Sequence, residues 1–125
     1  MFMFENLQVY QKSVDLADKI TNITHDFPKG FYYLTDQLNR AILSVALNLT
    51  EGNGRWHKND RKHFFYISRG STQECVPILE LCRRKKLISD EVNMELKKEL
   101  QVIAKMIYGL IHGLDEKGNE TIEKV

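Results

Sequence analysis

Apolar residues recur at three- and four-residue spacing in four segments of this 125-residue chain, which is the spacing of one buried helix face. The predicted helices span about residues 5–25, 36–51, 60–86 and 90–112. The inward-facing rows predicted from the spacing, in chain order, are Leu7, Tyr10, Val14, Ala17 and Ile20; Leu38, Ile42, Val45 and Leu49; Phe64, Ile67, Ser71, Cys75, Ile78 and Cys82; and Val92, Leu96, Leu100, Ile103, Ile107 and Leu110.

Turn and capping residues separate the first two helices. Pro28 and Gly30 end the first helix, because proline disfavours helix in the residue before it and glycine interrupts any continuation. Thr35 or Asp36 is the expected N-cap of the second helix. We expect that helix to stop at Gly52 and Gly54, the two glycines of the next turn.

The remaining helices have similar boundaries. Asn59 or Asp60 is the expected N-cap of the third helix and Ser89 that of the fourth. Pro77 falls inside the third helix, where it predicts a kink rather than a break because the apolar period continues past it. Short turns between long amphipathic helices predict an all-α, antiparallel up-down-up-down four-helix bundle over residues 1–114, followed by a charged, frayed tail over residues 115–125.

Composition favours an ordinary water-exposed domain. About two-fifths of the residues are apolar and 28% are charged. No apolar run approaches the roughly 20 residues of a membrane span, and the N-terminal residues do not resemble a signal peptide, so we expect a cytoplasmic protein without membrane contact.

Cysteine and histidine give no sign of a metal or a cofactor. Cys75 and Cys82 are seven residues apart on one helix, about 10 Å, which is too far for a disulfide between them. We expect two buried free thiols. The four histidines complete no zinc-binding spacing, so no metal or cofactor is predicted.

The second helix carries apolar and polar residues outside its inner row. Leu43 and Leu47 point away from that row, which predicts a subunit interface; the alternative is that they are merely tolerated on the surface or covered by the loop after Phe31. Polar residues on a separate face of this helix can brace the following turn and pair across an interface. An enzymatic role for them would require a catalytic partner in register with Glu51. The members of this polar face are Gln37, Arg40, Ser44, Asn48 and Glu51.

Basic charge is concentrated in one segment. Residues 55–88 carry nine Lys and Arg against three Asp and Glu, whereas the whole chain has a net charge of +1. Basic groups interleaved with aromatic ones suit phosphate contact and base stacking. The candidate nucleic-acid-binding residues are Arg55, Trp56, Lys58, Lys62, Phe65, Arg69 and Arg83. The alternative is a solvated face that pairs with acidic residues of the fourth helix.

Several segments of this pattern resemble one family. FENLQVYQKSVDLADKI, LTDQLNRAILSVALNLTEGNGR, FFYISRGS and the pair Leu110-Ile111 are similar to the four-helix bundle proteins named after 23S rRNA intervening sequences. The family motif positions that match are Gln37, Arg40, Ser44, Asn48, Glu51, Gly52, Gly54, Arg55, Arg69, Gly70 and Ser71. The chain departs from the family pattern at Asn39, where a basic residue is frequent, and at Ser68, where alanine is usual.

The resemblance implies a bacterial-type bundle that assembles into a ring, typically a pentamer. It also implies kinship with the accessory protein of diversity-generating retroelements, a basic pentamer that binds nucleic acid and works with a reverse transcriptase. We therefore expect a non-enzymatic RNA- or nucleoprotein-associated binding protein whose basic third helix contacts phosphates. The alternative is a homo-oligomeric protein-interaction scaffold with no nucleic-acid affinity. An enzyme that uses Glu51 with Asn48 and Arg40 is the third hypothesis, and it lacks a nucleophile or metal ligand set.

Overall fold

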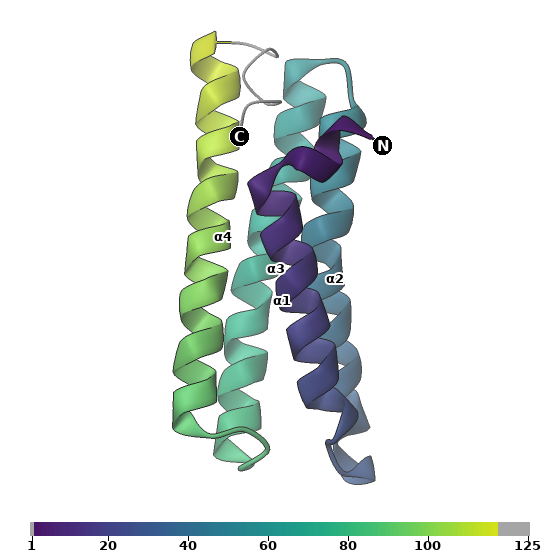
Figure 1. The fold of residues 1–125 in the computed structure, drawn as a ribbon, viewed down its shortest axis with the longest axis vertical. Helices are drawn as coiled ribbons and strands as arrows, with labels where there is room; N and C mark the ends of the chain where they lie inside the picture. Colours follow the sequence, from purple (N-terminus) through teal and green to yellow (C-terminus); the bar gives the residue numbers. More distant parts are fainter. Residues whose placement is uncertain (1, 118–125) are drawn as a thin grey trace.

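The computed structural model describes residues 2–117, which form an antiparallel four-helix bundle with no β-strand among them (Figure 1). This confirms the predicted fold class. Two short 3-10 turns precede the first and second helices. The elements are η1 (Met3–Asn6), α1 (Gln8–His25), η2 (Lys29–Phe31), α2 (Tyr32–Gly54), α3 (Lys58–Arg84) and α4 (Asp90–Lys117).

One apolar core runs along the bundle axis, and two of the predicted rows line it. All four predicted positions of α2 are buried. In α4 the row from Leu96 to Leu110 is buried, with Val92 half-buried at its start. No helix in the described part of the chain is long and apolar enough to cross a membrane.

The inner face of α1 differs from the prediction. Val14 is 41% exposed, whereas Val9, Ser13 and Leu16 are buried. Ser13 can be buried because its hydroxyl donates to the Val9 carbonyl at 2.7 Å, so the polar group keeps a hydrogen bond inside the core. In α1 the spacing favours the apolar Val14 over the neighbouring serine, because a buried serine adds nothing to an apolar row.

The inner face of α3 also differs from the prediction, with some buried positions one residue later than expected. Phe65 rather than Phe64 is fully buried, and Ile67 is exposed. Small hydroxyl residues complete this face: Ser68 donates to the Val45 carbonyl of α2 at 2.7 Å. The predicted Ser71, Cys75 and Cys82 are buried, and the helix continues through Pro77.

The predicted starts of α2 and α3 are wrong, and the predicted stop of α2 is confirmed at Gly54, the second of its two glycines. The N–H of Phe31 donates to the Pro28 carbonyl at 3.0 Å, and this 3-10 turn leads directly into α2 at Tyr32, before the predicted cap. Gly52 lies inside α2, which ends at Gly54. Helix α3 starts after His57, ahead of the predicted cap at Asn59 or Asp60.

The start of α4 agrees with the prediction, and its end does not. The hydroxyl of Ser89 accepts from the N–H of Val92 at 3.1 Å, which is the predicted N-cap. The helix continues past Gly113 to Lys117, with Leu114 buried, so residues 115–117 of the predicted tail are helical. Residues 118–125 lie outside the described residues.

Candidate nucleic-acid interface

The predicted basic residues do not form one patch, because they are spread along the whole of α3. Lys58 and Arg83 are 25 residues apart, which corresponds to roughly 38 Å of helix. Figure 1 shows the α2–α3 turn at the end where α1 begins and α4 ends, and the α3–α4 turn at the opposite end. Arg83 lies beside the second turn, where it forms ion pairs with Glu80 at 2.8 Å and Asp90 at 3.3 Å.

Two further basic side chains are directed toward α4. The ammonium of Lys62 lies 2.9 Å from the Asp115 carboxylate, whose hydrogen bond raises the pKa of Lys62 above its usual range. The guanidinium carbon of Arg69 lies 5.6 Å from the centre of the Tyr108 ring. These contacts agree with the alternative in which basic residues pair with the fourth helix.

Two acidic residues of α4 pair with α1 rather than with α3. Glu95 and Glu99 lie 2.6 Å and 3.1 Å from the ammonium of Lys19 in α1. Their hydrogen bonds raise the pKa of Lys19. The α3–α4 ion pairs instead involve residues near the two ends of α4, Asp90 and Asp115.

Phe65 cannot stack on a nucleic-acid base, so this part of the prediction is wrong. Its side chain is 0% exposed and packs against Gly52 of α2. A Cβ atom at Gly52 would lie 2.6 Å from the Phe65 ring and 3.2 Å from the Arg61 carbonyl oxygen. The glycine is therefore required for the close approach of α2 to α3 beside the turn.

The α2–α3 turn presents the remaining candidates to solvent. Trp56 is 79% exposed, and Arg55 and Lys58 are also exposed. The Arg55 guanidinium lies 3.2 Å from the Glu51 carboxylate and 4.7 Å from the centre of the Phe64 ring. These two contacts hold the guanidinium in one orientation at the end of the bundle.

Arg61, which the sequence prediction left out, braces this turn. Its Nε donates to the Arg55 carbonyl at 2.5 Å. The hydrogen bond joins the first turn of α3 to the residue that comes directly after α2. Arg55 and Arg61 are six residues apart, which is not the spacing of a helical contact. This hydrogen bond could therefore not be predicted from the sequence pattern.

The polar face of α2 is largely structural. Asn48 donates to both the carbonyl and the hydroxyl of Ser44 at 2.9 Å, and the Ser71 hydroxyl donates to the Ser44 hydroxyl at the same distance. The bond from Ser71 connects α3 to α2, and the two from Asn48 lie within α2. Gln37 is exposed, and Arg40 pairs within its own helix with Asp36 rather than across an interface here.

Metal-ligating and thiol groups were the other candidates for chemistry in residues 2–117. Among residues 2–117, no group of three or more His, Cys, Asp or Glu residues could hold a metal ion. Cys75 and Cys82 are buried free thiols, as predicted. Burial raises the pKa of the Cys75 thiol to about 12, so the nucleophilic thiolate is not populated near neutral pH.

Exposed apolar residues and two grooves mark the rest of the surface. Leu43 and Leu47 are 52% and 54% exposed, so no part of the described chain covers them as the loop alternative required. Gly70, on the neighbouring helix α3, has open space at its Cβ position.

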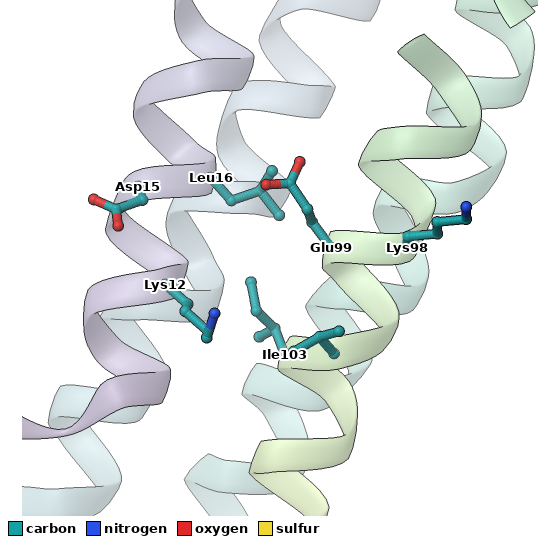
Figure 2. A pocket seen from close by; sticks show the side chains of 7 residues that line it. Lys12, Asp15, Leu16, Lys98, Glu99 and Ile103 are labelled. Atoms are coloured by element: carbon teal, nitrogen blue, oxygen red, sulfur yellow. The ribbon is translucent and has the colours of Figure 1, made fainter. Parts of the chain in front are cut away.

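The first groove lies between α1 and α4 and has a volume of about 240 Å³. Leu16 and Ile103 form its apolar floor. Figure 2 shows the Lys12 ammonium and the Glu99 carboxylate over the groove, whereas Asp15 points away from it.

The second groove, of about 480 Å³, lies at the α2–α3 end of the bundle. It is formed where η1 crosses the C-terminal end of α2, and it includes residues that the sequence prediction missed. Two aromatic residues in the first four positions were the only signal for it. Its lining residues are Phe2, Phe4, Thr50, Glu51, Gly54 and Arg55.

Comparisons with known proteins agree with this fold. A crystal structure of a protein with unknown function from the S23 ribosomal protein family of Bacteroides thetaiotaomicron superposes with a TM-score of 0.75 at 21% sequence identity. The match covers 82% of this chain and 97% of that chain, which shows the shared fold. No curated protein matches the sequence. The family described as 23S rRNA-intervening sequence protein matches residues 5–109, and the chain belongs to that family.

Proposed function

We propose that this protein is a non-enzymatic RNA- or nucleoprotein-binding module whose contact surface is the α2–α3 turn. The observation that carries the proposal is the exposure of Arg55, Trp56 and Lys58 together at one end of the bundle. A guanidinium and an ammonium suit phosphates, and an exposed indole suits an unstacked base. The matched family is not a known enzyme family.

The start of α3 adds a second attraction for phosphate. His57 makes no side-chain capping hydrogen bond to the helix that begins after it. The first N–H groups of α3 therefore carry no side-chain cap from His57, and the helix macrodipole adds partial positive charge there. An anion that approaches Lys58 meets both charges.

Self-association would multiply this surface. The exposed Leu43 and Leu47 suit contact with a second copy, and a ring, for which a pentamer is the expected size, would present several turns to one RNA. Changing both leucines to Glu should yield a folded, helical monomer by light scattering and circular dichroism. An unchanged oligomer would refute the assignment of this interface.

The direct test is a salt titration of binding to fluorescent single-stranded and hairpin RNA. The informative variant is Arg55→Glu with Lys58→Glu, because both side chains are exposed at the turn. The matched control is Arg84→Glu with Lys85→Glu, which reverses two exposed charges at the other end of the same helix. Both variants carry the same net charge.

We expect affinity to fall as salt rises, roughly in proportion to the number of phosphates contacted. The turn variant should lose about tenfold or more in affinity and show a shallower salt slope, whereas the control should lose little. Equal losses in both variants would indicate attraction by net charge alone. No RNA binding at about 0.15 M salt would contradict the proposal.

The second candidate function is a protein-interaction scaffold. Its support is the α1–α4 groove, whose apolar floor and charged walls suit an amphipathic helix of a partner. In that case the turn variant and the wild type would both fail to bind RNA. Val102→Glu, at the exposed wall of the groove, should then abolish capture of the partner while leaving the oligomer intact.

A further inference from the structure

Resting on the proposed RNA-binding function, we propose that the groove between η1 and the end of α2 binds one unpaired nucleotide. The base would stack on the outer face of Phe2, and the adjoining phosphate would lie at Arg55. This assigns a stacking residue outside the basic third helix. It also predicts that the protein prefers single-stranded RNA to paired RNA.

Two aromatic rings already stack on each other at one side of the groove. The Phe2 and Phe4 rings are nearly parallel, with centroids 5.6 Å apart and an interplanar angle of 12°. Phe4 in turn meets Tyr10 of α1 edge-on at 5.1 Å, which fixes the column to the bundle. Phe2 is nevertheless 70% exposed, so its face opposite Phe4 is available for a further ring. A base in that position would continue the column.

The opposite side of the groove supplies a positioned cation. The contacts of Arg55 with Glu51 and Phe64 fix its orientation while its side chain stays 48% exposed. A preoriented guanidinium loses less conformational freedom when it binds a phosphate oxygen. Gly54 adds no side chain between these two sides, so the floor of the groove stays open.

The chemistry of the groove favours a nucleotide. An aromatic face opposite a cation matches a base joined to its phosphate. Bases in an RNA duplex are already stacked and paired, so only an unpaired base can present its face to Phe2.

Charge and stacking make separable contributions here. Arg55 is paired with Glu51, so the groove itself carries little net charge and stacking supplies much of its affinity. Loss of the Phe2 ring should therefore lower affinity without changing the salt slope. Loss of the Arg55 charge should reduce that slope by about one contacted phosphate.

The test measures binding of the full chain to a fluorescent single-stranded RNA of mixed sequence, across a salt series. Phe2→Ala removes the stacking face, and Phe2→Trp restores one. The matched control is Tyr32→Ala, which removes an equally exposed aromatic ring at the far end of the bundle. Circular dichroism checks that each variant keeps the helical fold.

We expect Phe2→Ala to weaken binding to single-stranded RNA roughly tenfold at an unchanged salt slope. Phe2→Trp and Tyr32→Ala should bind like the wild type. A strand of the same length with abasic sites should bind the wild type about as weakly as the intact strand binds Phe2→Ala.

Three results would overturn the inference, and they are distinguishable from one another. If Phe2→Ala binds like the wild type while the Arg55→Glu, Lys58→Glu variant loses affinity, the proposed function stands and the stacking groove fails. If the wild type binds no RNA, the proposed function and the groove fail together. Tighter binding of a blunt, fully paired duplex than of the single strand would also contradict the groove.

Discussion

The two ends of α3 have the same formal composition of basic residues and present different surfaces. Four basic residues occur between Arg55 and Lys62, and four occur between Arg83 and Lys86. At the second end, Glu80 pairs with both Arg83 and Arg84, and Asp90 adds a second carboxylate to Arg83. At the first end an exposed indole stands beside an arginine and a lysine. Carboxylates pair with cations at both ends, since Glu51 contacts Arg55 and Asp115 contacts Lys62, so the exposed indole is the feature that distinguishes the first end.

The same two ends also differ in how the chain turns. After α3 the turn is built from local hydrogen bonds: the N–H of Lys86 donates to the Arg83 carbonyl and that of Leu87 to the Cys82 carbonyl, both at 2.9 Å. This is the Schellman arrangement, in which a residue with positive φ ends the helix. The α2–α3 turn instead depends on contact between helices, namely Gly52 against Phe65. One turn is local and the other is tertiary.

The largest expected effect comes from disturbing the tertiary turn. Gly52→Ala would place a methyl group against the buried Phe65 ring and the Arg61 backbone, so the free energy of unfolding should fall by about 1–3 kcal/mol. Urea unfolding at fixed protein concentration measures this change. The control is Gly109→Ala in α4, where no atom lies within 4 Å of the added Cβ and better helix propensity should raise stability by up to about 1 kcal/mol. An unchanged stability for Gly52→Ala would show that the two helices can separate at no cost.

A smaller effect is expected at the local turn, where Ser89 caps α4. Ser89→Ala removes the acceptor for the Val92 N–H and should cost about 1 kcal/mol of stability. Ser89→Asp keeps an acceptor and adds a favourable charge at the helix start, so it should match or exceed the wild type. Thermal unfolding distinguishes the pair. Equal destabilisation by Ala and Asp would mean that the cap hydrogen bond contributes nothing.

A stabilising change is expected three residues earlier. Lys86 has φ of 63°, a left-handed conformation that a side chain disfavours. Lys86→Gly should therefore raise the free energy of unfolding by about 0.5–1 kcal/mol, after allowing for the greater freedom of glycine in the unfolded chain. Lys85→Gly is the matched control, since Lys85 has φ of −82° and gains no such relief. Stabilisation of both variants alike would point to lost charge repulsion instead.

The smallest effect is the pH dependence contributed by Glu80. Hydrogen bonds from Arg83, and next from Arg84, lower the pKa of Glu80 from 4.5 to about 2. Because the folded pKa lies below the unfolded one, the stability from this group is present above pH 4.5 and is lost as the pH falls toward 2. Glu80→Gln should thus lose less stability than the wild type between pH 5 and pH 2 in denaturant titrations. Solvent screening keeps this difference small. Identical pH profiles would show that Glu80 does not contribute to the pH dependence of stability.

Helix-level features were predictable because they depend on residues close together in the chain. The buried row of α2 and the Ser89 cap could be inferred from spacing and side-chain type. The buried serines Ser13 and Ser68 were missed for a physical reason. A hydroxyl can enter a core when it donates to a carbonyl: Ser13 uses the Val9 carbonyl of its own helix, whereas Ser68 uses the Val45 carbonyl of α2, a partner set only by the packing of two helices.

Residues of the candidate site likewise divide into those that the sequence could predict and those that only the folded structure reveals. Sequence selected Arg55, Trp56 and Lys58 as candidate contacts because basic and aromatic residues are interleaved there, and the structure exposes all three. It grouped them with Arg83, although Arg83 lies at the opposite end of α3 from the α2–α3 turn. It also offered Phe65 as a stacking residue, and burial against Gly52 excludes this.

By itself, therefore, the sequence determined the four amphipathic helices, their order and the basic character of the third, since periodicity and composition are properties of the chain. Tertiary structure alone decided which face of α1 and α3 is buried and which cations are neutralised. It also brought Phe2 across the end of α2 beside Arg55. These outcomes depend on contacts between residues far apart in sequence, and burial and ion pairing are determined by those contacts rather than by residue type.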